Sequence, residues 1–221
     1  MEDGKIMNLN ILYEDNHIIV VEKKPNIPVQ EDESKDIDML TLIKEYLREK
    51  YNKPGNVYVG LVHRLDRPVG GVMVFAKTSK AASRLSNEIR LNNFKKKYYA
   101  VVHGKTKEQD TLVNYLLKDE KTNTSSIVSK DKGKEAILDY TLIKYNKEKD
   151  LSLLEINLKT GRHHQIRVQL AGINHPIYGD MRYGNDKIGI QIHLWAYELN
   201  FIHPVKKQWL TFTSKPNWHI I

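Results

Sequence analysis

Short β-rich runs separated by turns make up most of the sequence, and this pattern limits the fold more than any other feature. The first two runs lie within residues 11–22 and are joined by a polar turn, which predicts a hairpin. Further β-rich runs are VYVGLV, VGGVMVFAK, KKYYAVVHG, AILDYTLIKYN, LSLLEINLKT, IGIQIHLWAYELNFIHP and WLTFT. Because helical patterns interrupt these runs and no internal repeat is present, we expect a single α+β domain over residues 11–221 after an N-terminal extension at residues 1–10.

Three stretches between the β-rich runs carry a helical pattern. The apolar residues of the stretch 38–52 repeat at helical spacing, and KAASRLSNEIR shows the same repeat with Ser79 placed to cap its first turn. The third stretch is GRHHQIRVQLAG, and we expect Thr160 and Gly161 at its entry. Residues 105–135 are polar with a weak pattern, which predicts loops and short strands.

Basic residues outnumber acidic ones, which bears on the partner rather than on the fold. The net charge is +8 and the isoelectric point is near 9.3. Such a charge favours polyanions, because Lys and Arg side chains that neutralise phosphates drive nucleic-acid association. The same excess also serves solubility, so charge alone leaves both a nucleic-acid partner and an ordinary basic protein open.

Three absences bear on the cell compartment. The sequence has no cysteine, which excludes a disulfide framework and a thiolate zinc site and fits a reducing compartment. The N-terminal MEDGKIMNLN carries acidic residues and no long apolar core, unlike a secretory signal or a membrane anchor. No apolar run approaches the roughly 20 residues of a membrane helix. We therefore expect a cytoplasmic protein that does not associate with a membrane.

The stretch HRLDRPVGG places Asp66 between two arginines and ahead of two glycines. An isolated aspartate beside arginines is usually half of a solvated surface ion pair. Two other stretches change this interpretation, since KKKYYAVVHG and LKTGRHHQIRVQLAGINHPIYGDMRYG follow in chain order.

In this order and at these separations, the three stretches resemble those of RluA/RluD-type pseudouridine synthases, which isomerise selected uridines in RNA. The opening ILYEDNHIIVVEKKPNIPV and the closing IHLWAYELNFIHPVKKQWLTFTSKP also resemble the family, so most of residues 11–217 are covered. In that family, HRLD is usually followed by a Thr-Ser-Gly segment, whereas this chain continues with RPVGG. The resemblance implies a mixed, largely antiparallel sheet with flanking helices and a basic active-site cleft. Many relatives carry an N-terminal S4 domain, and we expect only the catalytic domain here.

By this resemblance, Asp66 is the catalytic carboxylate. The reaction breaks the glycosidic C–N bond, lets the detached base rotate and forms a C–C bond at C5, with no external cofactor and no metal. A carboxylate can act as a nucleophile or as a general base. Attack on the sugar, attack on the base and proton abstraction from the sugar therefore all stay open for Asp66.

Two further residues match catalytic positions of the family. Arg167 in HHQIR matches the arginine that pairs with the catalytic aspartate, and a planar guanidinium suits a bidentate carboxylate contact. Tyr98 matches the tyrosine of the Lys-x-Tyr pattern, whereas Tyr99 fits less well. The resemblance implies that Tyr98 stacks on the target base and takes part in proton removal from C5. The ordinary alternatives are a solvent-facing helix arginine and a core aromatic.

Three arginines are expected to bind RNA. A uridine inside folded RNA must leave its stack to reach a carboxylate. By the resemblance, Arg64 helps to fill the space that the flipped base vacates, and its flat cation suits stacking and phosphate contact. Arg67 and Arg162 are expected to contact RNA beside the site. Each of the three has an ordinary alternative as a solvated cation.

The histidines do not predict a metal site. Those nearest the three stretches are His63, His163, His164 and His175. No HExxH pattern occurs, no cysteine supplements them, and a positively charged cleft would repel a divalent ion. We therefore expect no metal ligands among them.

Three classes of function are open to such a chain: an RNA pseudouridine synthase, a catalytically silent RNA-binding protein on the same scaffold, and a hydrolase with a His-bound metal. The presence of Asp66, Tyr98 and Arg167 favours the first over the second, and the missing metal motifs disfavour the third. Ribosomal and transfer RNA both fit as substrates, and the modified uridine is not readable from these residues. We expect the chain to act as a monomer.

Overall fold

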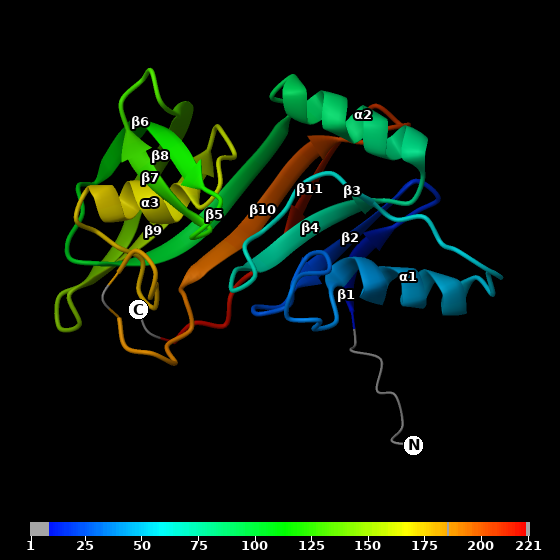
Figure 1. Ribbon diagram of the computed structural model, residues 1–221, viewed down its shortest axis with the longest axis horizontal. Coiled ribbons are helices and arrows are strands. Elements are labelled where there is room, and N and C mark those ends of the chain that lie inside the picture. Colours follow the sequence, from blue (N-terminus) through cyan, green and yellow to red (C-terminus); the bar gives the residue numbers. More distant parts are fainter. Residues whose placement is uncertain (1–8, 185, 220–221) are drawn as a thin grey trace. The chain divides into compact units, whose positions relative to one another are not determined.

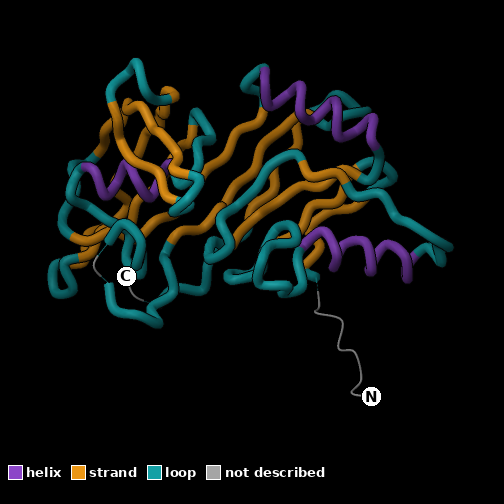
Figure 2. The backbone as a smooth tube through the Cα atoms, viewed as in Figure 1, coloured by secondary structure: helices purple, strands orange, loops and turns teal. Residues whose placement is uncertain are grey.

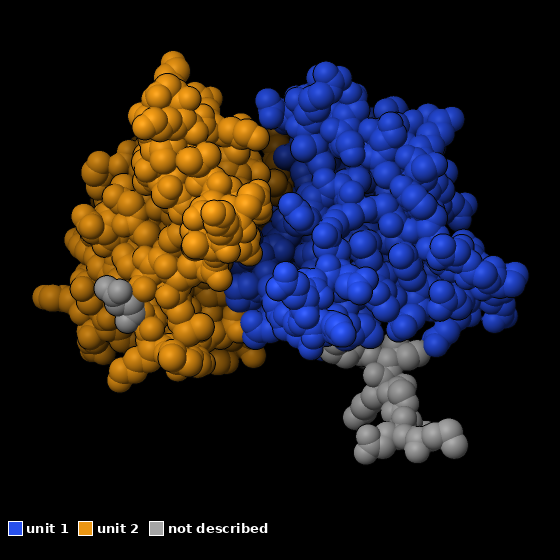
Figure 3. Space-filling view, in the orientation of Figure 1, with its two compact units in different colours: residues 1–94, 198–214 blue, residues 95–197, 215–221 orange. Residues whose placement is uncertain are grey.

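The computed structural model describes residues 9–184 and 186–219, which divide into two compact units (Figure 3). Unit 1 contains the described residues up to Phe94 together with Glu198–Ser214; unit 2 contains Lys95–Tyr197 and the described residues from Lys215 onward. That the two units belong to the single domain expected over residues 11–221 stays a prediction.

The N-terminal extension expected at residues 1–10 falls largely outside the described part of the chain. Residues 1–8 are not described, and Asn10 already begins the first strand. The extension therefore also stays a prediction.

Unit 1 is built on a sheet with the strand order β1-β2-β4-β10 (Figure 1). Its strands are β1 (Asn10–Glu14), β2 (Ile18–Lys23), β3 (Gly60–Leu61), β4 (Gly70–Ala76), the C-terminal half of β10 (Leu194–Ile202) and β11 (Trp209–Thr213). β3 pairs with β4 and β11 pairs with β10, both antiparallel. β1 and β2 form the hairpin expected from the sequence, whereas VYVGLV contributes only the two residues of β3.

Alternation along β2 and β4 creates the core of unit 1. One face of these strands is apolar and packs with α2 (Ser79–Arg90), which contributes Ala81 and Leu85. The sheet residues in this cluster are Ile18, Val20, Val72, Val74, Ala76, Phe94, Leu199 and Phe201. The intervening residues Ile19 and Val21 point to the opposite face and are fully buried as well.

Both helices of unit 1 begin at a capping side chain. The Asp38 carboxylate accepts hydrogen bonds from the backbone of Leu40 and Thr41 at 2.9 and 3.1 Å, which starts α1 (Met39–Lys50). For α2 the sequence prediction was wrong, because the cap is Thr78 and Ser79 is the first helical residue. Thr78 has the extended backbone that a cap needs, and its Oγ1 accepts from Ala81 at 3.1 Å.

Unit 2 contains the strand order β10-β5-β9-β8-β6-β7, in which β10 contributes its N-terminal half. The strands are β5 (Phe94–His103, of which Phe94 belongs to unit 1), β6 (Gln109–Asp119), β7 (Thr124–Val128), β8 (Lys134–Asn146) and β9 (Leu151–Leu158). The pairs β5–β9, β8–β9, β6–β8 and β6–β7 are all antiparallel.

The segment 105–135 is more regular than its sequence indicated. It contains β6, which has 11 residues and pairs on both sides, so the expectation of only loops and short strands was wrong. β6 buries Leu112 and Leu116 but leaves Val113 and Leu117 half exposed. Apolar residues on both faces hide the alternation that marks a strand, which explains the weak pattern.

The short helix α3 (Gln165–Gly172) contacts β6 and β7 of the same unit (Figure 2). It starts later than the sequence suggested, because Thr160 lies in a bend, Gly161 lies in a loop, and His164, with a φ of 53°, precedes the first turn. The Gln165 Oε1 accepts from the Thr160 hydroxyl at 2.8 Å and from the Arg162 backbone at 3.0 Å. These bonds tie the bend to the helix.

The fold class expected from the sequence is confirmed: the chain is α+β, with a mixed, largely antiparallel sheet and, in the described residues, three helices. None of these three helices combines the length and the apolar character needed to cross a membrane.

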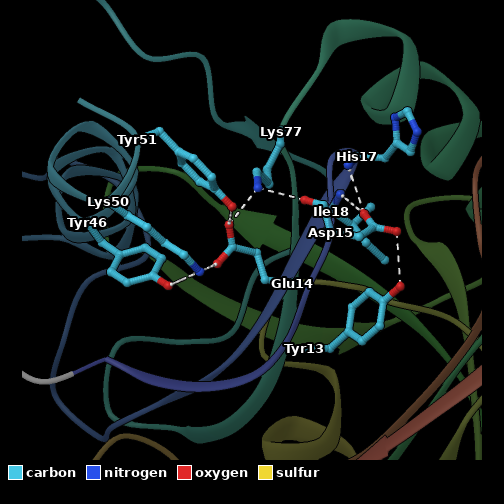
Figure 4. A network of polar contacts seen from close by, with 9 residues as sticks. All are labelled: Tyr13, Glu14, Asp15, His17, Ile18, Tyr46, Lys50, Tyr51 and Lys77. Carbon is cyan, nitrogen blue, oxygen red and sulfur yellow. Dashed lines mark hydrogen bonds and ion pairs between the residues drawn. The ribbon is translucent and has the colours of Figure 1, made fainter. Parts of the chain in front are cut away.

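Two acidic residues at the end of the first hairpin strand anchor unit 1, as Figure 4 shows. Glu14 accepts hydrogen bonds at 2.6 to 2.9 Å from Lys77, Lys50, Tyr51 and Tyr46. Burial alone would raise the pKa of Glu14, but these four donors outweigh it and lower the pKa to about 2. The carboxylate thus joins β1 to α1 and to the end of β4.

Asp15 fixes the turn of the same hairpin. Its Oδ1 accepts from the backbone of His17 and Ile18 at 2.8 and 3.0 Å (Figure 4). Its Oδ2 accepts from Tyr13 at 3.0 Å and from the buried His203 at 2.8 Å. Burial opposes ionisation, yet these donors hold the pKa of Asp15 well below its usual range.

We expect Glu14→Gln to lower the free energy of unfolding at pH 7 by about 2 kcal/mol, because it leaves two lysines without their carboxylate. The ordinary pKa of 4.5 falls to about 2 on folding. The wild-type advantage is therefore complete above pH 4.5 and disappears as the pH falls toward 2. Urea unfolding across this range measures it. Glu120→Gln, at an exposed carboxylate paired with Lys118, is the control and changes stability by less than about 0.5 kcal/mol. Equal losses for both variants at pH 7 would contradict the anchoring role.

Candidate active site

Asp66 lies in a tight turn of unit 1 between β3 and β4. Its carbonyl accepts a hydrogen bond from the Val69 backbone at 2.9 Å, which closes the turn. The side chain of Asp66 is partly exposed, whereas Leu65 and Val69 on either side are buried. The local pattern of buried and exposed residues therefore holds the carboxylate at the surface on a backbone anchored at both ends.

Several contacts within unit 1 fix the turn that carries Asp66. The Arg67 carbonyl accepts from the Asn26 backbone at 2.9 Å and from the Lys23 Nζ at 2.8 Å. The His63 Nε2 accepts from the Val74 backbone at 3.1 Å and so attaches the start of the segment to β4. Gly71, at the other end, has a φ of 128°, a conformation that suits glycine.

Arg64 and Arg67 differ in their surroundings. Within the described part of the chain, the exposed Arg64 side chain makes no hydrogen bond or ion pair. The Arg67 guanidinium instead donates to Ser34 at 2.8 Å, to Asp32 at 3.4 Å and to Asp36. Arg64 is thus available to a ligand, whereas Arg67 would have to exchange carboxylate partners for phosphate.

In unit 2, the adjacent tyrosines of β5 point to opposite faces of the sheet. Tyr99 stacks on Tyr197 with ring centroids 3.9 Å apart, and Tyr197 donates to Glu155. Tyr98 lies on the other face, is 5% exposed and pairs in register with Ile156. The structure therefore gives Tyr99 a packing role, in keeping with its weaker match to the family pattern, and leaves Tyr98 as the candidate.

Lys96 shares the face of β5 that carries Tyr98. Its Nζ lies 3.3 Å from the point that a Cβ of Gly161 would occupy, so a larger residue at 161 would press on the ammonium. Burial lowers the pKa of Lys96, and among the described residues no carboxylate or other acceptor pairs with it. A desolvated ammonium in this state is suited to an anionic ligand.

Arg167 forms a bidentate ion pair with a residue that sequence reasoning missed. Its Nε and one terminal nitrogen each donate to Asp180 at 2.8 Å, and both side chains are buried. The guanidinium also lies 5.2 Å from the Tyr183 ring centroid. Burial would raise the pKa of Asp180, but the hydrogen bond and charge of Arg167 lower it. Asp180 therefore fixes the orientation of Arg167.

Arg162, the remaining residue expected to bind RNA, has a partner within unit 2, as do His163 and His164. Arg162 is exposed and donates its Nε to the Glu135 carbonyl at 2.8 Å. His163 contacts Ser125 at 2.9 Å, and His164 contacts Tyr183 at 2.8 Å. In the described ranges, no group of three or more His, Cys, Asp or Glu side chains could hold a metal ion.

The residues expected to act together belong to different units. Asp66, Arg64 and Arg67 lie in unit 1, whereas Tyr98 and Arg167 lie in unit 2. Pairing of Asp66 with Arg167 stays a prediction, as do the roles of all these residues in catalysis and RNA binding. Chemically, unit 1 offers an accessible carboxylate beside free and paired arginines, and unit 2 offers a phenol, a desolvated ammonium and an oriented guanidinium.

Two residues of these surroundings were not expected from the sequence, namely Lys23 and Asp180. Asp180 lies in GINHPIYGDMRYG, a segment that the sequence indicated only as structural support. Lys23 stands beside Lys24, and the residue type does not distinguish the two lysines. The apolar run before Lys23 is the one signal, since a residue that continues a buried strand is more often enclosed.

Comparison with known proteins connects this geometry to one family. A model of the RNA pseudouridylate synthase family matches residues 17–172. An uncharacterized RNA pseudouridine synthase of Aquifex aeolicus (strain VF5) is 32% identical over 215 residues, which cover 92% of this chain and 68% of that protein. Ribosomal large subunit pseudouridine synthase C of Buchnera aphidicola subsp. Baizongia pistaciae (strain Bp) is 36% identical over 221 residues, covering 95% and 67%.

A solved structure shows the same fold. Human RNA Pseudouridylate Synthase Domain Containing 1 superposes with a TM-score of 0.76 at 22% identity, covering 98% of this chain and 86% of that one. At this identity the likeness concerns the fold alone.

We expect Asp180→Asn to lower the free energy of unfolding by roughly 3 kcal/mol, because it removes the Asp180 charge from a buried ion pair with Arg167. Asp139→Asn is the matched control, since Asp139 pairs with Lys159 at 3.1 Å on the surface and should cost less than about 1 kcal/mol. Chemical denaturation followed by the fluorescence of unit 2 measures both. A loss for Asp180→Asn no larger than that for the control would show that the pair does not hold Arg167.

Proposed function

Because this chain belongs to the RNA pseudouridylate synthase family and is an RNA pseudouridine synthase, an isomerase, we propose that Asp66 is the carboxylate with which it converts uridines of ribosomal or transfer RNA to pseudouridine. The observation that carries the proposal is the placement of Asp66. It is a partly exposed carboxylate on a turn whose backbone is held on both sides, next to an arginine without a partner in the described residues.

The reaction sets clear demands on such a carboxylate. The C1′–N1 bond of uridine breaks, the base turns, a C1′–C5 bond forms, the hydrogen at C5 leaves as a proton and N1 gains a proton. Atoms and electrons balance without any redox partner. Asp66 serves this sequence either as a nucleophile toward the sugar or the base, or as a base toward the sugar, and all three roles need an ionised and fixed carboxylate.

Residues of unit 2 supply the remaining chemistry in this proposal. Tyr98 has a buried ring that stacks on the detached base, and its phenol takes the proton from C5. Arg167 pairs with the Asp66 carboxylate during the reaction. Its bidentate contact with Asp180 supports this role, because the contact fixes the guanidinium plane before any RNA arrives.

The charge of the chain and its relatives support RNA as the substrate. A net charge of +8 favours phosphates, and one similar protein is described as a ribosomal large subunit pseudouridine synthase. Arg64, Arg67 and Arg162 are the proposed RNA contacts, of which Arg64 occupies the place of the flipped base. We place the enzyme in the cytoplasm, where such RNA is found, and expect a monomer, which sedimentation would test.

Replacement of Asp66 tests the proposal most simply. Asp66→Asn should lower the single-turnover rate at saturating RNA by roughly 10³-fold or more while RNA affinity stays within about threefold, because the carboxylate does chemistry that binding does not require. Chromatography of nucleosides from digested ribosomal and transfer RNA measures the product. Asp131→Asn, at an exposed aspartate of unit 2, is the control with the same change of charge. Pseudouridine formed by Asp66→Asn at the control rate would exclude the assignment.

Arg64 should affect base flipping more than binding. We expect Arg64→Ala to slow the reaction on a structured RNA about tenfold at saturation, with affinity reduced by no more than about threefold, because the vacated stack is no longer filled. Lys80→Ala, at an exposed cation of α2, serves as the control and leaves the saturated rate unchanged. If Arg64→Ala reacts at the wild-type rate once saturated, Arg64 is one more phosphate-facing cation.

A further inference from the structure

An acidic loop at residues 31–36 binds the arginine that stands beside the candidate catalytic carboxylate. Four of the six residues of this loop are acidic, although the chain as a whole carries a net charge of +8. Two of them, Asp32 and Asp36, accept hydrogen bonds from the Arg67 guanidinium, the first at 3.4 Å. The Ser34 hydroxyl accepts a third bond from Arg67 at 2.8 Å. In the free protein, a proposed RNA contact is therefore already occupied.

The loop keeps its shape through hydrogen bonds of its own. The Asp32 Oδ1 accepts from the Ser34 backbone at 3.0 Å and from the Ser34 hydroxyl at 2.5 Å. The Ser34 Oγ in turn accepts from the Asp36 backbone at 3.2 Å. The hydrogen bonds from Ser34 lower the pKa of Asp32, and Arg67 lowers it further. Because the bonds within the loop do not involve Arg67, its acceptors stay together when the guanidinium leaves.

The contact between the loop and Arg67 lies at the surface and can be exchanged. The side chains of Arg67, Asp32 and Asp36 are 39%, 41% and 55% exposed. Exposed ion pairs contribute little to stability, because water screens the charges and long side chains must be held still. The backbone of Arg67 is anchored separately, since its carbonyl accepts from the Asn26 backbone at 2.9 Å. The guanidinium can therefore turn away without release of its backbone.

The oxygens around Arg67 resemble those that an RNA phosphate offers. A guanidinium binds carboxylate and phosphate in the same way, through charge-assisted hydrogen bonds to two or more oxygens. Both terminal nitrogens of Arg67 donate to the loop, so the end of the guanidinium is not available to a bidentate phosphate. The carboxylates of Asp32 and Asp36 would also repel a phosphate placed beside them. A phosphate that binds the end of Arg67 must therefore displace the loop.

We propose that Asp32 and Asp36 set the affinity of the enzyme for RNA: they occupy Arg67 in the free protein as a phosphate would, and RNA must displace them to reach it. The loop is thus an autoinhibitory contact. RNA that binds by backbone charge alone gains little at this point, because the new phosphate contact is offset by the lost carboxylate contacts. The inference rests on the proposed RNA contact of Arg67 and assigns no catalytic step to the loop.

A double-mutant cycle on RNA affinity tests the proposal. Asparagine in place of Asp32 and Asp36 keeps the size of the side chain and one acceptor oxygen but removes the charge. We expect Asp32→Asn/Asp36→Asn to bind RNA about tenfold more tightly than wild type at constant salt. Fluorescence anisotropy measures this with labelled RNA, using whichever of transfer RNA and fragmented ribosomal RNA the wild type binds more tightly.

The matched control is Glu31→Gln/Glu33→Gln, which removes two charges from the same loop. Within the part of the chain that the structure describes, both glutamates are exposed and make no hydrogen bond or ion pair. Their replacement reports only the general repulsion between the loop and RNA, which salt screens. It should tighten RNA binding by less than about threefold.

Arg67→Met decides whether the gain comes from this contact. In an otherwise wild-type chain, Arg67→Met should weaken RNA binding by less than about threefold, because the loop offsets the contact that is lost. Combined with Asp32→Asn/Asp36→Asn, it should weaken binding about tenfold, because Arg67 is then free for phosphate. In the Arg67→Met background, replacement of the two aspartates should change affinity no more than the control does.

Three results would overturn the proposal. A gain for Asp32→Asn/Asp36→Asn no larger than that of the control, or a gain that is equal with and without Arg67, would reduce the loop to general repulsion. Weaker binding by the same variant would mean that the carboxylates hold Arg67 in place for RNA. Because the cycle measures affinity, a fully active Asp66→Asn would refute the proposed chemistry and leave the result of the cycle standing.

Discussion

A positive charge buried under a turn of backbone is the constraint on which the candidate site depends. The Lys23 ammonium is enclosed in the core of unit 1, where it can stay charged only if its three donors meet oxygens. Those oxygens come from the backbone next to it and from the turn that follows Asp66. The turn and the ammonium thus stabilise each other. The backbone of the turn that begins at Asp66 is fixed by these hydrogen bonds.

Unit 2 also buries a cation, but there a carboxylate and not only backbone carbonyls accepts its hydrogen bonds. Arg167 is enclosed together with Asp180, so its charge is balanced by a full carboxylate in the same unit. Lys23 has only carbonyl acceptors, so its charge is left to act on Asp66. Asp180 thus fixes the direction of a guanidinium, whereas the Lys23 ammonium binds the backbone of the turn that carries Asp66.

The sequence predicted the elements whose pattern is local and strong. The β1–β2 hairpin, α1 and most strands lie where apolar spacing places them, since that spacing follows from burial of one face. β6 was not expected because Val113 and Leu117 are apolar on its exposed face. The cap of α2 was misplaced by one residue, because Thr78 and Ser79 both have the chemistry of a cap and only backbone conformation separates them.

The residues of the candidate site also divide into those that a local motif indicates and those that no motif indicates. Resemblance identified Asp66, Tyr98 and Arg167 because each stands in a recognisable motif. Lys23 and Asp180 were missed because their importance lies in partners distant in sequence: Lys23 contacts a carbonyl 46 residues away, and Asp180 binds an arginine 13 residues before it. The residue type does not distinguish Lys23 from Lys24, although one lysine is buried and the other is exposed.

Release of tritium from RNA labelled at C5 of uridine tests the central claim, isomerisation of uridine within RNA by this chain, most directly. Formation of the C1′–C5 bond expels the hydrogen at C5, so purified wild-type protein should release tritium from ribosomal or transfer RNA. The RNA length should not change, no free uracil should appear, and unlabelled RNA should keep its mass. Free uracil without tritium release would indicate a glycosidase, and RNA binding with neither product would indicate a silent binding protein. Either result would contradict the account.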